Sequence, residues 1–214
     1  MKNDIKIALI GGTGKSGKYL VRELINRKIS FNLLVRNPEK QPESHPLIDV
    51  IQGNVRDYAT VRKLTEGCQA VISTLGLGQP PSETSIFSIS TSNIIRAMRA
   101  NHIQRYIVIT GLNVDATHDK KGPKTKFATN WMYTNFPLTT TDKQKEYNIL
   151  KASDLSWTMV RLPLIEQTEV RADVAVDSED CPGERITAAD LADFLIGQVF
   201  DDAYIRMAPF LANI

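Results

Sequence analysis

The sequence predicts an α/β fold, a single doubly wound parallel sheet with helices on both faces. Apolar runs of strand length alternate with helix-like stretches along the chain, which is the pattern of repeated strand–helix–strand units. The first apolar run, residues 5–10, leads directly into a glycine-rich turn and an amphipathic helix. A chain of 214 residues has the usual size of one unit, so residues 1–214 are expected to form a single domain.

The glycine-rich turn carries two overlapping patterns. Gly12, Gly14 and Gly17 give GxGxxG, whereas Gly11, Gly14 and Gly17 give GxxGxxG. The phosphate-binding loop of NTPases would need a glycine where Leu9 stands, so the pattern favours a dinucleotide site. Between a strand and a helix, such a turn lets a pyrophosphate approach bare backbone and the helix N-terminus. The residues expected to bind the cofactor here are Gly11, Thr13, Gly14, Lys15, Ser16 and Gly17.

The second strand is predicted over residues 31–35 and leads into Arg36. An acidic residue at this place would accept hydrogen bonds from the ribose of NAD and would repel the 2′-phosphate of NADP. The chain has no carboxylate here before Glu39, and Arg36 presents a planar donor group that suits a phosphate. We therefore expect NADP(H) to be favoured over NAD(H).

The middle of the chain continues the alternation. A third strand is predicted over 47–51, a short helix over 57–66 and a fourth strand over 70–75. Asp57 is the expected N-cap of the helix, and Gly67 the residue that ends it.

The turns that follow these strands supply further cofactor-binding candidates. The turn after the third strand would lie at the adenine edge, and small residues after the fourth would let the backbone pass the ribose and nicotinamide. The candidates are Asn54, Val55, Thr74, Leu75 and Gly76.

The second half of the chain predicts a helix over 83–101, a strand over 106–110, a helix over 141–153 and a strand over 157–162. A last helix opens at residues 187–190 with a box-like Thr/Asp pair.

Residues 112–140 interrupt this rhythm, because they show no clean period. They hold several lysines and then four aromatic residues, Phe127, Trp131, Tyr133 and Phe136. A long loop in a small domain is commonly functional, and this one begins at the edge where ligands bind in open α/β sheets. We therefore expect a substrate-side lid around 112–140; the alternative is a solvated basic loop whose aromatic residues pack on the domain edge.

Composition excludes several classes of partner. A net charge of +2 is too small to indicate nucleic acid or an anionic membrane, and no stretch resembles a signal or membrane helix. The two cysteines do not form a disulfide framework, which fits a reducing, cytoplasmic compartment. The three histidines have no metal-binding spacing, so no metal site is expected. We expect a monomer or small homo-oligomer that binds a small planar acceptor.

Several motifs together resemble the atypical short-chain dehydrogenases, closest to the NAD(P)H-binding NmrA-like and biliverdin/flavin-reductase-like groups. They are GGTGKSG, LLVRNPEK, GNVRD, ISTLG, RYIVITG, LKASDLSWTMVRLP and ITAADLADFL, which follow one another in the family's order. The resemblance implies a Rossmann fold, NADP(H), and reduction of a flavin, a biliverdin-like tetrapyrrole or a quinone-like acceptor. It also implies that Pro163 borders the nicotinamide and that residues 164–186 lie on the substrate side.

The catalytic positions depart from the superfamily pattern of Ser or Thr followed by Tyr-x-x-x-Lys. Tyr147 and Lys151 have the right spacing, but the family register instead places Lys143 in the lysine position and Thr139 in the tyrosine position. Gly111 occupies the serine position, and Thr110 precedes it. The candidate catalytic residues are Thr110, Lys143 and Tyr147, with Thr110 also a candidate cofactor ligand.

Three functions are compatible with this sequence. The first is an NAD(P)H-dependent reductase that transfers hydride to a flat acceptor, since the cofactor itself carries that chemistry. The second is a non-catalytic, NADP(H)-binding redox sensor or regulator. The third is an NAD-dependent sugar epimerase or dehydratase, which would need a working Ser/Thr, Tyr and Lys set.

Overall fold

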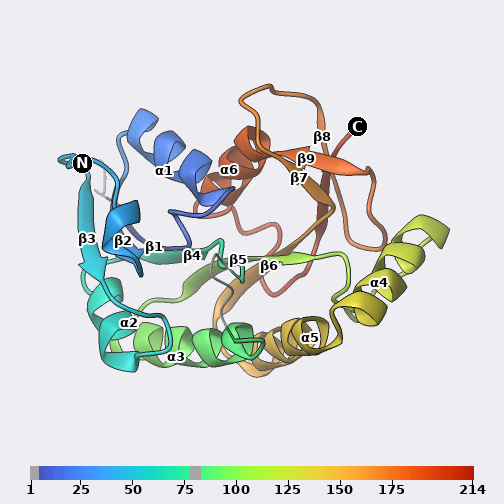
Figure 1. Ribbon diagram of the computed structural model, residues 1–214, viewed down its shortest axis with the longest axis horizontal. Helices are drawn as coiled ribbons and strands as arrows, with labels where there is room; N and C mark the ends of the chain where they lie inside the picture. The colour runs from blue at the N-terminus through green and yellow to red at the C-terminus, as the bar shows by residue number, and fades with distance from the viewer. Residues whose placement is uncertain (1–4, 78–82) are drawn as a thin grey trace.

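The computed structural model describes residues 5–77 and 83–214, and within them eight strands form one sheet (Figure 1). Residues 1–4 and 78–82 of the predicted domain lie outside the described residues. The strand order is β3-β2-β1-β4-β5-β6-β10-β8. The strands are β1 (Lys6–Ile10), β2 (Ser30–Val35), β3 (Ile48–Gln52), β4 (Ala70–Ser73), β5 (Arg105–Gly111), β6 (Ser156–Leu162), β8 (Val174–Asp177) and β10 (Phe210–Asn213).

The sheet is parallel from β3 to β10, which confirms the predicted fold class. The sequence order reverses at β1, since β2 lies on one side of it and β4 on the other. One edge departs from the prediction, because β8 runs antiparallel to β10. Two further strands, β7 (Leu164–Glu166) and β9 (Arg185–Thr187), pair with each other outside the main sheet.

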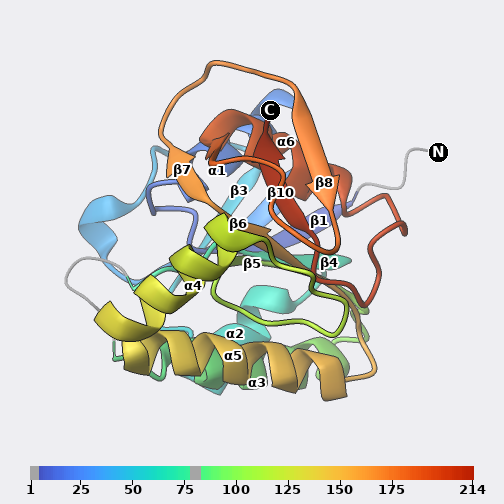
Figure 2. The ribbon, with the colours of Figure 1, turned by 90° about the vertical axis from the view of Figure 1, so that its right-hand side faces the viewer.

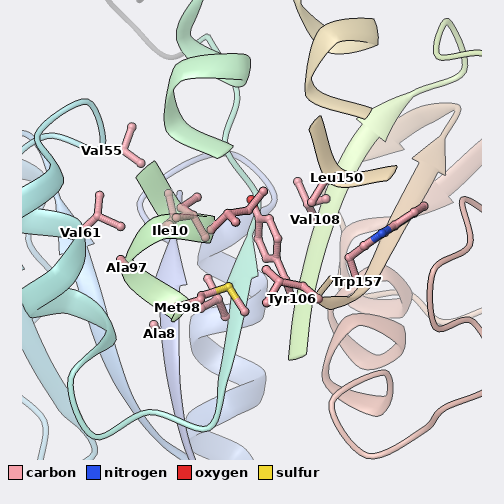
Figure 3. Packing of buried hydrophobic residues seen from close by; sticks show 14 of the residues in the cluster. Ala8, Ile10, Val55, Val61, Ala97, Met98, Tyr106, Val108, Leu150 and Trp157 are labelled. Carbon is pink, nitrogen blue, oxygen red and sulfur yellow. The ribbon is translucent and has the colours of Figure 1, made fainter. Parts of the chain in front are cut away.

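Helices cover both faces of the sheet, as predicted (Figure 1). On one face α1 (Gly17–Asn26) packs beside α6 (Ala188–Gly197), over a core that includes Leu9, Leu33 and Ile107. On the other face lie α2 (Tyr58–Thr65), α3 (Ile86–Ala100) and α5 (Pro137–Ala152). Their core contains Val108 and Trp157 (Figure 3). The central strands therefore separate two cores, which explains why they read as continuous apolar runs.

Two predicted helix starts are confirmed at the level of single atoms. Asp57 accepts hydrogen bonds from the amides of Ala59 and Thr60, at 3.2 and 3.1 Å, and so caps α2. Gly67 follows that helix with a φ of +71°. Thr187 accepts from the amide of Asp190 at 3.1 Å at the start of α6.

The prediction of a long irregular loop between the fifth strand and the next helix is wrong for much of its length. Residues Pro123–Asn135 form helix α4, and α5 begins at Pro137, four residues earlier than predicted. Figure 2 shows α4 above α5. Helix α4 buries only Thr125 and Thr129, so it has no apolar stripe that could reveal a helical period. A short 3₁₀ helix, η1 (Pro38–Lys40), follows β2.

Candidate functional site

The glycine turn bends tightly around the end of β4. Gly11 has a φ of +82°, and a Cβ atom there would lie 2.6 Å from the carbonyl oxygen of Thr74. A Cβ at Gly17 would lie 2.1 Å from the carbonyl oxygen of Gly11, so the start of α1 touches the turn. The amide of Gly14 donates to the carbonyl of Gly11 at 2.9 Å. Only glycine permits this approach of backbone to backbone.

The start of α1 is built to receive an anion. Ser16 occupies the N-cap without a side-chain hydrogen bond to the helix, and the first turn contains no acidic residue. Thr13, Gly14 and Lys15 are exposed around it. The amides of Lys18 and Tyr19 donate to the carbonyls of Gly14 and Ser16, at 3.2 and 3.1 Å, so a pyrophosphate would meet the amides of the preceding turn and the helix dipole, and the residues present fit a dinucleotide cofactor.

The parallel register gathers nearly all of the predicted cofactor residues at one edge of the sheet. The carboxyl ends of β1, β2, β3, β4, β5 and β6 all face this edge. The residues at or just beyond these ends are Gly11, Arg36, Asn54, Val55, Thr74, Leu75, Gly76, Thr110 and Pro163. This is the edge at which open α/β sheets bind their ligands.

In the turn that follows β3, Asn54 organises the backbone around it. Its Oδ1 accepts from the amide of Arg56 at 3.0 Å, and Val55 is buried in the core. Asn93 of α3 donates to the carbonyls of Val55 and Arg56, at 3.1 and 2.8 Å. Asn93 is a residue that the sequence did not point to, since its partners are 38 and 37 positions away. Arg36 lies exposed at the end of β2.

Two threonines near the ends of β4 and β5, Thr74 and Thr110, have buried side chains. Thr74 donates from its hydroxyl to the carbonyl of Ile10 at 3.2 Å, which ties β4 to β1 behind the glycine turn. Thr110 is buried, and its hydroxyl has no hydrogen-bond partner in the structure. The nearby Asn113 is buried too, with its Nδ2 unpartnered. These are polar groups in need of a partner at the carboxyl edge.

The two helical candidates have different surroundings. Lys143 is half-buried, with its ammonium 3.9 Å from the centroid of the Phe87 ring at the start of α3. Burial lowers the pKa of Lys143, against the attraction of Glu146 and Asp142. Tyr147 packs in the core with its ring edge-on to Trp157, at 6.0 Å between centroids. Lys143 is therefore partly open to solvent, whereas Tyr147 lies in the core. Thr139, which the family register places in the tyrosine position, is buried.

The first part of the expected lid is held by two buried cations. Arg161 is completely buried and donates to Asp119 Oδ1 at 2.6 Å and to the carbonyls of Val114 and Ala208. Lys121 is also buried, and its ammonium donates to the carbonyls of Leu112 and Val114. This segment is thus anchored to β6 and to the C-terminal strand region, while Lys120 remains exposed beside Glu179.

The second part of that segment presents aromatic side chains to solvent. Phe127 is 73% exposed and Trp131 49% exposed on α4, and Phe136 follows the helix. The rings of Trp131 and Phe136 meet edge to face at 5.7 Å. Leu164 of β7 is another exposed apolar residue, on the segment predicted to lie on the substrate side.

Other kinds of site find little support in the described ranges. Within residues 5–77 and 83–214, no group of three His, Cys, Asp or Glu residues is placed to hold a metal ion. Hollows of about 470 and 520 Å³ lie between α3 and α5 and beside β3, and no residue of the glycine turn lines either one. None of the helices described is both long and apolar enough to cross a membrane.

Comparison with known proteins agrees with this geometry. The model of a family described as NAD(P)H-binding matches residues 11–202, which span the glycine turn and the last helix. A chloroplastic protein of Arabidopsis thaliana is 23% identical over 196 residues, covering 87% of this chain and 68% of that protein.

Solved structures share the fold at lower identity. A short-chain dehydrogenase/reductase from Veillonella parvula, in complex with NADP, has a TM-score of 0.82 at 14% identity, covering 98% of this chain and 94% of its own. ChuY, an anaerobillin reductase from Escherichia coli, has a TM-score of 0.78 at 17% identity, covering 97% of each chain. Identities this low establish the fold alone.

Proposed function

The chain belongs to the NAD(P)H-binding family, and from that premise we propose that it is an NADPH-dependent reductase whose acceptor is a small planar molecule. The observation that carries the proposal is the gathering of the glycine turn, Arg36 and the ends of β4 and β5 at one edge. The cofactor supplies hydride there, and the chain has to hold both reactants in line.

The preference for NADPH rests on Arg36. It follows β2, where the adenine ribose would lie, and the sequence places no carboxylate there before Glu39 to accept hydrogen bonds from a 2′-hydroxyl. A guanidinium forms paired, charge-assisted hydrogen bonds with phosphate, which favours the phosphorylated cofactor.

The planar acceptor is proposed from exposed aromatic side chains on the segment that follows β5. Phe127, Trp131 and Phe136 are exposed on the segment between β5 and α5, next to the anchored loop of Asp119. Exposed aromatic rings give a flat ligand stacking surfaces. A tetrapyrrole, flavin or quinone-like acceptor would suit them, and the solved reductase ChuY acts on anaerobillin by its own description.

Two alternatives rank lower. A redox sensor would bind the cofactor without turnover, and we rank it lower because the exposed aromatic side chains offer stacking surfaces to an acceptor. Sugar epimerase chemistry would need a tyrosine at the nicotinamide, whereas Tyr147 packs against Trp157 in the core. We also propose a reducing, cytoplasmic setting, in line with two unpaired cysteines, and a monomer or small homo-oligomer.

The test is an NADPH oxidation assay with FMN, riboflavin, biliverdin and simple quinones, run beside cofactor titrations. We expect turnover with at least one of them. Binding of NADPH without turnover of any acceptor would refute the reductase proposal and favour the redox sensor.

A pair of variants tests the cofactor preference. Arg36→Ala should weaken NADPH binding about tenfold or more and NADH binding little, since a charged phosphate contact exceeds about 1.4 kcal/mol. Arg99→Ala removes an equal charge at the far end of α3, where Arg99 pairs with Asp154, and should change neither. Equal losses for both cofactors in Arg36→Ala would refute the assignment.

A further inference from the structure

The segment between β5 and α4 contains a buried ammonium group that the proposed function does not use. Lys121 is 7% exposed and lies shortly before Pro123, where α4 begins. Its Nζ donates hydrogen bonds to the carbonyl oxygens of Leu112 and Val114, at 2.9 and 3.1 Å. Both carbonyls belong to the turn that directly follows β5 at the carboxyl edge of the sheet. A cation near the end of this segment thus holds the backbone at its start.

Three side chains complete a cage of oxygen atoms around this ammonium. Asp115 Oδ1 accepts a hydrogen bond from Nζ at 2.6 Å, and Asp119 Oδ2 lies 3.7 Å away. Thr129 of α4 accepts from Nζ at 3.4 Å and donates its own hydroxyl hydrogen to the carbonyl of Leu112 at 3.2 Å. Since an ammonium has three N–H donors, the surrounding oxygen atoms satisfy it fully. Lys121 therefore ties the turn after β5 to α4.

The charges around this cage balance. Arg161 of β6 shares Asp119 with Lys121, because its guanidinium donates to Oδ1 at 2.6 Å. It also donates to the carbonyl of Val114 at 3.2 Å, so that this carbonyl is fixed by both cations. Asp115, the second carboxylate, is exposed, and solvent reaches the cage from its side. Removal of Lys121 would leave the carboxylates with too few cations and the carbonyls with too few donors.

Two polar side chains at the end of β5 take no part in holding the turn. Thr110 and Asn113 are buried, and in the described ranges neither the Thr110 hydroxyl nor Asn113 Nδ2 has a hydrogen-bond partner. Asn113 folds back on the end of the strand, since a Cβ at Gly111 would lie 2.5 Å from its Oδ1. The cage therefore sets the shape of the backbone from outside, next to the place where the nicotinamide and the acceptor would lie.

The opposite end of β5 offers a comparison within one strand. Arg105 is a buried cation that also donates to backbone carbonyls, those of Gln198 and Ser156, both at 2.8 Å. It is the first residue of β5, and the length of the strand separates it from the carboxyl edge by about 20 Å. Arg105 and Lys121 thus hold backbone in the same way, but at opposite edges of the sheet.

We propose that Lys121 is a positioning residue of the reductase: its ammonium is the built-in cation of the cage, and it fixes the turn after β5 so that the acceptor is held in line with the hydride of the cofactor. The inference rests on the proposed function. Lys121 acts through the backbone of the turn and touches neither reactant. Loss of its ammonium should leave cofactor binding at the glycine turn unchanged and slow hydride transfer, because a displacement of about 1 Å at the reacting atoms can cost about a hundredfold in rate.

The first test needs no turnover. Lys121→Ala removes the equivalent of an n-propylammonium ion and leaves its place open to solvent beside Asp115. The Tm should fall by about 6–12 °C, which is the cost of breaking a buried ion pair in a chain of this size. Added n-propylammonium chloride should restore part of this loss, whereas tetramethylammonium chloride, whose cation has no N–H donor, should not. The wild type should respond equally to the two salts, and an equal response in Lys121→Ala would overturn the cage.

The second test measures hydride transfer in a single turnover, with NADPH and with FMN as the probe acceptor. Lys121→Ala should bind NADPH as the wild type does and transfer hydride about tenfold more slowly or worse, and n-propylammonium should restore the rate. Arg105→Ala also removes a buried cation that holds β5, but it should keep a rate close to that of the wild type. Equal rate losses in the two variants, or a wild-type rate in Lys121→Ala, would overturn the positioning role.

A milder variant covers the case in which Lys121→Ala does not fold. Thr129→Val keeps the ammonium but removes the hydroxyl that joins α4 to Leu112, and it should slow hydride transfer without weakening NADPH binding. A wild-type rate in Thr129→Val would then overturn the proposal. If the wild type reduces no acceptor, the proposed function fails and the positioning role falls with it, whereas the comparison of the two salts still decides whether the cage holds a cation.

Discussion

Replacing Gly11 by alanine tests whether the glycine turn owes its shape to close contact between backbones. The residue has a φ of +82°, and its added Cβ would lie 2.6 Å from the carbonyl oxygen of Thr74 and 2.9 Å from the amide nitrogen of Leu75. Both atoms belong to the backbone at the end of β4, so no side-chain rotation can relieve the overlap. The turn or the end of β4 has to move.

The loss of unfolding free energy in Gly11→Ala has two contributions, which a matched control variant separates. Gly67 also has a positive φ, +71°, but a Cβ there would meet nothing within 4 Å. Gly67→Ala therefore measures the conformational cost alone, about 1 kcal/mol. Gly11→Ala adds the overlap, about 1–3 kcal/mol by analogy with overpacked cores, for a total of about 2–4 kcal/mol.

Urea unfolding of both variants gives the free energies, and titration with NADPH gives the affinity. Gly11→Ala should lose about 1–3 kcal/mol more stability than Gly67→Ala, and about 2–4 °C of Tm for each kcal/mol. It should also lose most of its NADPH binding, whereas Gly67→Ala keeps it. Equal destabilisation of the two variants would refute the argument from close approach.

Three further outcomes follow from buried charges. Asp119→Asn should cost about 3 kcal/mol in urea unfolding, because Arg161 is left as a buried cation without its carboxylate; a loss under about 1 kcal/mol would contradict that pairing. Asp142→Ala should cost about 2 kcal/mol, because it leaves two amides at the start of α3 without an acceptor, and amide exchange should speed up there first. Since the pKa of Glu146 is raised from 4.5 to about 7 in the folded protein, stability should fall as the pH rises from about 4.5 to 7, by about 3 kcal/mol in all. Glu146→Gln should remove that fall, and an unchanged pH dependence in the variant would contradict the buried carboxyl.

The first half of the fold could be predicted closely from sequence because its signals are local. The strands of the nucleotide-binding half are continuous apolar runs. Asp57 marks a helix start by its capping side chain, and Gly67 marks a helix end by its positive φ. The glycine turn likewise carries its function in its residues, since a close approach of backbones leaves few alternatives to glycine.

Helix α4 and strands β8 and β10 were not predicted, because their order depends on distant partners. Helix α4 has little buried surface, so no period marks it. Strand β10 pairs with β6 and β8, neither of which adjoins it in sequence. The buried state of Arg161 depends on Asp119, Val114 and Ala208, which no local pattern connects. The burial of Glu146 was missed for the same reason, because on a helix surface it reads as an ordinary charged residue.

The central claim is that the carboxyl edge holds NADPH so that hydride passes to a planar acceptor. The most direct measurement is an anaerobic single turnover with NADPH in which both hydrogens on C4 of the dihydronicotinamide are deuterium, with each acceptor in turn. We predict stoichiometric oxidation, a slower rate for the labelled cofactor and deuterium recovered in the reduced acceptor, where its new bond does not exchange with water. The claim would be contradicted if protein saturated with NADPH left the cofactor reduced with every acceptor. It would also be contradicted by oxidation in which no label appears in an acceptor whose new bond does not exchange.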